Sequence, residues 1–292
     1  MTIKKYLDKL PDLTGQEILI TGGTSGIGLA IVQHLLYKGA SVVILARNLT
    51  KAEVVKVSLL HDYPNASISI IEYDQSKEEI ITKAVQEINI KHSKFDAIIL
   101  NAGIFASKNS AYQYGEMGLT IKTNYYGLYL FCKQLLADNH YAHRFIFQGS
   151  LVAGLPMKAN SSLSEKNISS WQQYVIAKSG VAALFYHWCT NYQGPSSFYL
   201  VEPGITSTDI IRDFNVVIRF LGKWFLKIFP NSNQKAALTA LLSLTEKTAN
   251  RSFIIPRGLF AFSGYPKIVP FPKKRRKEYL YQMLLEEEKS LE

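Results

Sequence analysis

Tyr174 and Lys178, four residues apart in the stretch YVIAK, are the residues of this sequence best suited to proton chemistry. On a helix, this spacing places both side chains on one face, one turn apart. A free tyrosine has a pKa of about 10, which is too high for ready proton exchange at neutral pH. A nearby ammonium group lowers that pKa, so Tyr174 is a candidate general acid or base. The alternative is a solvated helix surface on which the pair has no role.

A glycine-rich segment, TGGTSGIG at residues 21–28, continues the apolar run EILIT and precedes a helical pattern. Glycines permit a tight turn and a close approach of the backbone to a bulky anion. The N-terminus of the following helix offers free N–H groups and a positive dipole end to a pyrophosphate. The order strand, turn, helix therefore predicts a dinucleotide site rather than a plain turn. The candidate contacts are Thr21, Gly22, Thr24, Ser25, Gly26, Ile27 and Gly28.

Arg47 stands at the end of the second expected strand, about 20 residues after the glycine segment, where many dehydrogenases have an acid for the ribose hydroxyls. A carboxylate would repel a 2′-phosphate, whereas the planar guanidinium of arginine binds phosphate well. This position favours NADP(H) over NAD(H). The alternative is a solvated loop arginine, and Thr24 and Ser25 supply hydroxyls nearby but no second cation.

Short apolar runs alternate with longer helical patterns along most of the chain. Strands are expected at 17–21, 41–46, 67–71, 97–100, 144–147 and 197–201. Helices are expected from Ile27 onward and at 77–92, 111–139 and 171–192. This alternation predicts the α/β class, a single doubly wound (Rossmann-type) parallel sheet with helices on both faces. We expect one domain over 1–292, with a substrate-binding segment at about 205–235 and a basic tail at about 270–292.

Further polar motifs follow along the chain, and all but Asn124 lie at or just beyond the carboxyl ends of expected strands. They are Asn101-Ala102-Gly103, the helix residue Asn124, Ser150, and Pro203-Gly204 followed by Thr208. Together with T-G-x-x-x-G-x-G and Y-x-x-x-K, these motifs resemble the short-chain dehydrogenase/reductase family, in its order, over residues 21–208. The stretch RGLFAFSGYP at 257–266 resembles the branch that holds retinol dehydrogenases and protochlorophyllide reductases.

The resemblance implies a role for each matching residue. Tyr174 would act as general acid or base, Ser150 would hold the substrate oxygen, and Lys178 would also bind the nicotinamide ribose. Asn124 would hold a water that links Lys178 to solvent. The remaining implied cofactor contacts are Asp74, Asn101, Ala102, Gly103, Pro203, Gly204 and Thr208. Asp74 is alternatively an ordinary helix cap.

The spacing between Ser150 and Tyr174 is wider than is usual in the family, by about one short loop. The extra residues resemble the polar stretch NSSLSEKNISS at 160–170, which we expect to be a surface loop at the pocket rim. Ser161, Ser162 and Ser164 compete with Ser150 by position alone, and none of them follows a strand.

The segment 211–229 has basic residues along one side of a helical pattern and apolar residues along another. We interpret it as a lid helix over an apolar pocket. The alternative is a helix that lies on an anionic membrane surface and takes a lipophilic substrate from it. Both interpretations predict an apolar substrate.

Composition excludes several other classes of protein. The net charge is +10, but the run KKRRK at 273–277 has no accompanying nucleic-acid motif, so we expect a solvated surface there and no nucleic-acid partner. The histidines have no metal-ligand spacing, and Cys132 and Cys189 are isolated. The N-terminus has no signal-peptide pattern, and we expect no membrane-spanning helix. These features predict a cytoplasmic protein that is at most peripheral at a membrane.

The function that we expect is NADP(H)-dependent interconversion of a carbonyl and an alcohol on a small hydrophobic molecule. Two alternatives remain at this point: a catalytically silent dinucleotide-binding sensor or scaffold, and a nucleotide-sugar epimerase or dehydratase. The resemblance also implies a homodimer or homotetramer formed through the helices beside Tyr174.

Overall fold

The computed structural model describes residues 1–105, 117–137, 142–157, 163, 168–206, 231–245 and 248–291. Several predictions fall outside these ranges. They concern Thr208, the three competing serines, the amphipathic stretch 211–229 and most of the substrate-binding segment.

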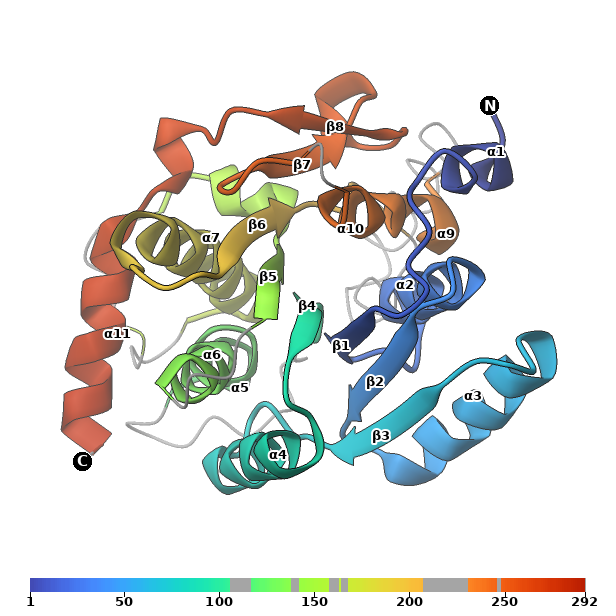
Figure 1. Cartoon of the computed structure of the whole chain (residues 1–292). Coiled ribbons are helices and arrows are strands. Elements are labelled where there is room, and N and C mark those ends of the chain that lie inside the picture. Colours follow the sequence, from blue (N-terminus) through green and yellow to red (C-terminus); the bar gives the residue numbers. More distant parts are fainter. Residues whose placement is uncertain are drawn as a thin grey trace.

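A sheet in the strand order β3-β2-β1-β4-β5-β6-β7-β8 forms the centre of the molecule (Figure 1). Its strands are β1 (Glu17–Thr21), β2 (Ser41–Ala46), β3 (Ile68–Glu72), β4 (Phe95–Leu100), β5 (Ala142–Gln148), β6 (Ser197–Val201), β7 (Phe253–Pro256) and β8 (Pro266–Val269). Neighbouring strands from β3 to β7 pair in parallel, and β8 pairs with β7 antiparallel. The predicted doubly wound α/β fold is confirmed.

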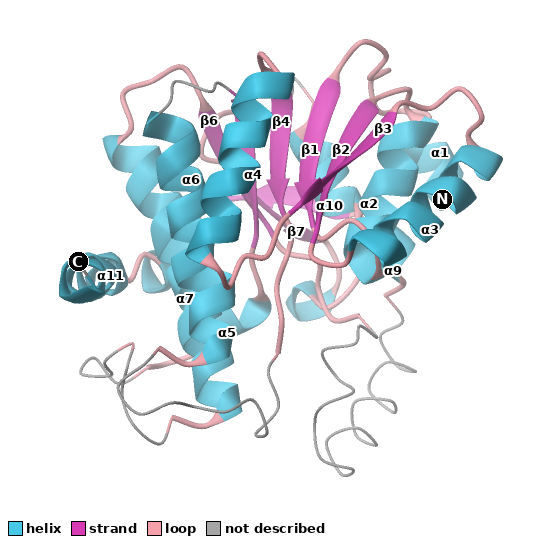
Figure 2. Ribbon diagram, turned by 90° about the horizontal axis from the view of Figure 1, so that it is seen from below, coloured by secondary structure: helices cyan, strands magenta, loops and turns pink. Residues whose placement is uncertain are grey.

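Helices cover both faces of this sheet (Figure 2). One apolar core lies beneath α4 (Glu78–Lys91), α6 (Gly127–Ala137), α7 (Ser170–Asn191) and α11 (Glu278–Leu291). The other lies beneath α1 (Ile3–Leu7), α2 (Gly26–Tyr37), α3 (Leu49–Asp62) and α10 (Leu238–Ser243), with the short α9 (Asn233–Ala236) packed against α2. Alternate side chains of each strand enter opposite cores, so the β-branched runs read from the sequence are buried on both faces.

The helix predicted at 111–139 differs from the structure in its described part. There the chain forms α5 (Leu119–Ile121), a π-helical turn η1 (Lys122–Tyr126) and then α6. Gly127 begins α6 and does not break the helical segment. The main chain of Gln75 packs closely against it, and a Cβ on Gly127 would lie 1.7 Å from the main-chain oxygen of Gln75. The π turn contains Asn124 and shifts the register of the residues before α6.

The C-terminal segment contains elements that the sequence patterns did not predict. After β8 come the 3-10 turn η5 (Lys273–Arg275) and α11, which packs against α7. Leu280 and Leu284 of α11 are fully buried, and the Tyr125 hydroxyl donates to the main-chain oxygen of Leu280 at 2.7 Å. The prediction of a solvated basic run is wrong at Arg275, which is only 7% exposed.

Candidate active site

The glycine-rich turn joins β1 to α2 at the carboxyl edge of the sheet. Gly22 and Gly26 adopt φ values of 72° and 56°, in the left-handed region that favours glycine. A Cβ on Gly28 would lie 2.1 Å from the main-chain oxygen of Gly22, so only glycine fits there. A Cβ on Gly26 would meet nothing within 4 Å, which leaves open space above the turn.

The N-terminus of α2 is suited to an anion. Its N-cap residue, Ser25, is exposed and makes no side-chain capping hydrogen bond to the first turn. The N–H groups of that turn and the positive dipole end of α2 therefore remain available to a phosphate. Thr24 and Ile27 are partly exposed on the same turn.

Asn101 and Thr21 hold this turn to the end of β4. The Asn101 Nδ2 atom donates to the main-chain oxygens of Thr21 at 3.0 Å and Gly22 at 3.1 Å. The buried Thr21 hydroxyl accepts from the Ala102 N–H at 2.9 Å. Both side chains therefore fix the shape of the turn.

Arg47 and Asp74, two of the predicted cofactor contacts, differ in whether their charged groups already have partners in the protein. Arg47 is exposed, and no hydrogen bond or ion pair links its guanidinium to the parts of the chain that the structure describes. The Asp74 carboxylate accepts hydrogen bonds from the N–H and hydroxyl of Ser76, at 3.0 and 2.6 Å. The cap residue of α4 is Lys77, so the helix-cap alternative for Asp74 is wrong, and its carboxylate stabilises the turn before that helix.

Asn124 lies in the π turn and is 1% exposed. Its side chain forms two hydrogen bonds with the main chain of Ile104, donating at 2.7 Å and accepting at 2.8 Å. A Cβ built on Gly103 would lie 3.4 Å from Asn124 Oδ1 and 3.6 Å from Lys178 Nζ. The structure therefore brings Gly103, Asn124 and Lys178 together at the end of β4.

Tyr174 lies in the second turn of α7, and a capping box between Ser169 and Gln172 fixes the start of this helix. Tyr174 is 7% exposed, and a hydrogen bond joins its phenol to the Ser150 side chain. The aromatic rings of Phe105 and Trp171 flank it, with centroids 5.5 and 6.3 Å away. Ser150 follows β5 and caps the 3-10 turn η2 (Leu151–Gly154).

Lys178 follows one turn later and is 6% exposed. Its ammonium donates to the main-chain oxygen of Gln148 at 3.1 Å, two residues before Ser150. Ser150, Tyr174 and Lys178 therefore converge where β5 meets α7. Gly180 permits this placement of α7, because a Cβ there would lie 2.6 Å from the ring of Tyr125.

The structure does not show the expected lowering of the Tyr174 pKa. Burial raises the pKa of Tyr174, the hydrogen bond with Ser150 lowers it, and the charge of Glu202 raises it. Burial lowers the pKa of Lys178 to about 8, against the opposing effect of Glu202. At neutral pH, the tyrosine is therefore a phenol and the lysine is mainly an ammonium.

Glu202 and Arg275 are charged residues beside the site that sequence reasoning missed. Glu202 directly follows β6, is 0% exposed and forms an ion pair with Arg275. A signal existed for Glu202, because a carboxylate stands between an apolar strand and Pro203-Gly204. Nothing in the run KKRRK distinguished Arg275 from its neighbours.

Pro203 and Gly204 begin the loop after β6. Gly204 has a φ of 77°, and a Cβ on it would lie 2.4 Å from the main-chain oxygen of Phe262. The side chain of Asn231 donates to the main-chain oxygen of Pro203 at 2.6 Å. The loop is therefore held from two sides as it leaves the sheet.

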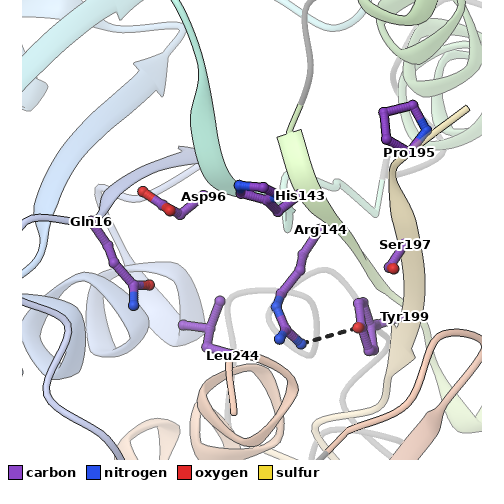
Figure 3. A pocket seen from close by; sticks show the side chains of 8 residues that line it. All are labelled: Gln16, Asp96, His143, Arg144, Pro195, Ser197, Tyr199 and Leu244. Carbon is purple, nitrogen blue, oxygen red and sulfur yellow. Dashed lines mark hydrogen bonds between the residues drawn. The ribbon is translucent and has the colours of Figure 1, made fainter. Parts of the chain in front are cut away.

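A pocket of about 320 Å³ lies at the opposite, amino-terminal edge of the strands (Figure 3). Its lining residues are Gln16, Asp96, His143, Arg144, Pro195, Ser197, Tyr199 and Leu244. Arg144 Nη1 donates to the Tyr199 hydroxyl at 3.0 Å and to the main-chain oxygen of Ser243 at 2.8 Å. Because these bonds tie β5 and β6 to α10, we interpret Arg144 as a structural anchor.

Two further properties concern metals and membranes. Within the described ranges, no group of three or more His, Cys, Asp or Glu side chains is placed to hold a metal ion. Among the helices in those ranges, none is long and apolar enough to cross a membrane.

Comparison with known proteins identifies relatives for this arrangement. A family model described as short chain dehydrogenase matches residues 16–216. The human 3-keto-steroid reductase/17-beta-hydroxysteroid dehydrogenase 7 is 34% identical over 114 residues, which are 38% of this chain and 31% of that protein. The short-chain dehydrogenase TIC 32 B, chloroplastic, of Brassica napus is 34% identical over 120 residues, 40% of this chain and 37% of that protein. The chain thus aligns with about a third of the length of these two relatives.

Solved structures share the fold over more of the chain. An uncharacterized protein from Mycobacterium paratuberculosis has a TM-score of 0.71 at 21% identity, covering 96% of this chain and 97% of that one. Levodione reductase has a TM-score of 0.63 at 20% identity, covering 80% of this chain and 91% of its own.

Proposed function

Because this chain belongs to the short-chain dehydrogenase family, we propose that it is an oxidoreductase that interconverts a carbonyl group and an alcohol with NADP(H). The observation that carries this proposal is the convergence of Ser150, Tyr174 and Lys178 at one end of the sheet. All three lie at the carboxyl edge, where open α/β sheets bind ligands.

A nicotinamide dinucleotide fits the residues present. The turn at Gly22, Gly26 and Gly28 offers a close backbone approach, and the first turn of α2 offers N–H groups to the pyrophosphate. The buried amide of Gln148, at the end of β5, has no hydrogen-bond partner among the residues described. Unpaired polar groups are therefore available to a ligand both at the N-terminus of α2 and at the end of β5. When bound, the nicotinamide would supply the hydride in reduction or accept it in oxidation.

The protein's own residues would handle the proton. Ser150 would donate a hydrogen bond to the substrate oxygen as negative charge develops there, and Tyr174 would give that oxygen its proton. The raised pKa of Tyr174 keeps the phenol protonated at neutral pH, which is the state that reduction requires. The Lys178 ammonium would then stabilise the phenolate that remains.

Arg47 supports the choice of NADP(H). It follows β2 at the edge where the adenosine ribose would lie, and its guanidinium is exposed. The planar, permanently charged group suits a 2′-phosphate. Asp74, the acidic residue among the predicted cofactor contacts, already accepts hydrogen bonds from Ser76.

The proposed substrate is a small apolar molecule. The rings of Phe105 and Trp171 beside Tyr174 give the reacting group apolar neighbours. By its name, the human relative acts on a steroid ketone, which is a carbonyl on an apolar ring system.

A fluorescence titration with NADPH and NADH, followed by a panel of aldehydes and ketones, tests this function. We expect tighter binding of NADPH, and a flattened or reversed preference in Arg47→Asp. Lys51→Asp, which makes the same change of charge on the first turn of α3, serves as the matched control and should keep the preference. Equal affinities of the unaltered protein for both nucleotides would contradict the assignment of NADP(H). Binding without turnover of any carbonyl would instead support a silent sensor.

A further inference from the structure

Glu202 is a buried carboxylate close enough to Tyr174 and Lys178, the proposed catalytic pair, to affect the charge of both. It lies at the end of β6 with 0% exposure, and its charge raises the pKa values of both Tyr174 and Lys178. A buried carboxylate is costly unless a partner balances its charge. The charges that surround Tyr174 therefore depend on what holds Glu202.

Arg275 is that partner, and it comes from a segment far along the chain. Its Nη1 atom donates to the Glu202 carboxylate and also to the main-chain oxygen of Ser150, at 3.3 Å. The guanidinium packs over the ring of Phe253 at 5.1 Å, and a Cβ on Gly154 would lie 3.4 Å from its Nε. One side chain thus bridges the proposed catalytic serine and the buried acid.

A second contact holds the same segment in place. Lys277 Nζ donates to the main-chain oxygen of Leu155 and to the Ser179 hydroxyl, both at 2.9 Å. Leu155 follows the serine turn η2, and Ser179 is the residue after Lys178 on α7. The C-terminal segment therefore joins the loop that bears Ser150 to the helix that bears Tyr174.

The ionisable groups around Glu202 come from α7 and from the C-terminal segment at η5 and just after it. Tyr174 and Lys178 face it from α7, Arg275 faces it from η5, and Lys277 lies beside Arg275. The other four C-terminal basic residues differ from Arg275 in burial or contacts, and Lys274 in particular is exposed. Arg275 is the residue of this run that forms an ion pair with the carboxylate, and the charge of Lys178 adds to its effect.

We propose that Arg275 is a positioning residue of the active site, which holds Glu202 and the Ser150 main chain together and balances the buried charge behind Tyr174 and Lys178. The inference rests on the proposed function, because it assigns a reaction to those two residues. It gives the C-terminal segment a part in catalysis in addition to its part in folding.

The two partners should affect Lys178 in opposite directions. Removing a positive charge near an ammonium makes the proton harder to lose, and removing a negative charge makes it easier to lose. We therefore expect Arg275→Met to raise the pH at which Lys178 titrates, and Glu202→Gln to lower it. Each shift should be about one pH unit, and the double variant should return close to the unaltered protein.

The test follows Lys178 by NMR in the full-length protein labelled with ¹³C at the lysine ε-carbons. The signal that disappears in Lys178→Met assigns the resonance, and no turnover is needed. The pH profile of kcat/KM for carbonyl reduction is measured on the same variants. We expect Arg275→Met to lose about tenfold in kcat/KM, with recovery in the double variant Glu202→Gln/Arg275→Met. Lys274→Met should change neither readout.

Opposite shifts that cancel in the double variant would support the proposal. Loss of packing alone would not move the pKa of Lys178 in opposite directions, so opposite shifts identify the effect of charge. If the pKa of Lys178 stays the same in both single variants, the proposal is overturned, even if activity falls. If Arg275→Met fails to fold, the pKa of Lys178 is compared between Glu202→Gln, where it should fall, and the double variant, where it should return close to that of the unaltered protein. The expected NMR shifts without any carbonyl turnover in the unaltered protein would overturn the proposed function and leave the charge balance established.

Discussion

Lys178 and Gln148 are joined by a hydrogen bond of 3.1 Å, from the ammonium to the main-chain oxygen. The bond fixes α7 to the end of β5, two residues before Ser150. It also places the ammonium in a buried position, where burial lowers its pKa to about 8 and Glu202 opposes that effect. The lysine that would support the proton transfer of Tyr174 is therefore held by the strand that carries the serine.

The titration of Lys178 predicts a pH dependence of dinucleotide binding. The cation is present below about pH 8 and lost above it, so we expect the affinity for NADPH to fall as pH rises through 8. Fluorescence titrations between pH 6.5 and 9.5, about 1.5 units on either side of this pKa, would measure the effect. Lys178→Met should bind more weakly and show no such fall.

The same group predicts the sign of a change in stability. Its pKa is about 8 in the folded protein and near the ordinary 10.5 when unfolded, so the unfolded chain binds more protons between these pH values. The contribution of Lys178 to the free energy of unfolding should therefore increase from pH 8 to 10.5. Urea unfolding of the unaltered protein and Lys178→Met, compared across this window, isolates that contribution. The free energy of unfolding of the unaltered protein, relative to that of Lys178→Met, should rise over this range. A relative free energy that falls as pH rises would contradict the prediction.

Two glycines of the dinucleotide turn should respond differently to alanine. Gly28→Ala forces a Cβ within 2.1 Å of the Gly22 oxygen, so we expect both stability and NADPH binding to be lost. Gly26→Ala meets no atom within 4 Å and should lose about 1–2 kcal/mol of stability from its φ of 56°. Its effect on NADPH binding should be larger than its effect on stability. Thermal unfolding with and without NADPH distinguishes the two, and equal behaviour would count against this reading of the turn.

Asn101 should matter through the donor that it supplies. Asn101→Asp keeps the shape of the side chain but removes the N–H groups that contact the main-chain oxygens of Thr21 and Gly22. We expect a loss of about 1–3 kcal/mol in stability and weaker NADPH binding, with kcat at saturating NADPH little changed. Urea unfolding and steady-state kinetics measure these effects. A large fall in kcat without a change in affinity would place Asn101 in the chemical step instead.

Helix α11 should contribute to stability through its buried leucines. Leu284→Ala should cost about 2–5 kcal/mol, because Leu284 is 0% exposed in the core shared with α7. Lys289→Ala, on the exposed side of the same helix, should change stability by less than about 0.5 kcal/mol. Urea unfolding compares the two. Similar values for both variants would mean that α11 is not docked as described.

The fold was predictable where local pattern and burial agree. The runs that became β1, β2 and β6 were read with their observed bounds, because continuous β-branched sequence suits strands that are covered on both faces. The π turn around Asn124 was not predictable, since its extra residue depends on Ile104 and on Gly127 packing against a distant loop. β7, β8 and α11 were not predicted. β7 joins the sheet beside β6, and α11 packs on α7, so both depend on partners far away in the sequence. β8 pairs only with β7, and its short run PKIV gave no strand pattern.

The site was predictable as a set of motifs, and less so as a set of charges. The positions of Ser150, Tyr174 and Lys178 followed from motif order, and the structure brings them together. The expected low pKa of Tyr174 was wrong, because burial and the charge of Glu202 outweigh the hydrogen bond with Ser150. The ion pair between Glu202 and Arg275 joins residues 73 positions apart, and no local spacing reveals such a contact.

Single-turnover oxidation of NADPH by Tyr174→Phe, with an aldehyde that the unaltered protein reduces, is the most direct measurement. The variant keeps the ring and its packing between Phe105 and Trp171 and removes only the hydroxyl. We expect it to bind NADPH as tightly as the unaltered protein and to oxidise it at least about a hundredfold more slowly. Oxidation at the rate of the unaltered protein would show that the proton comes from another group.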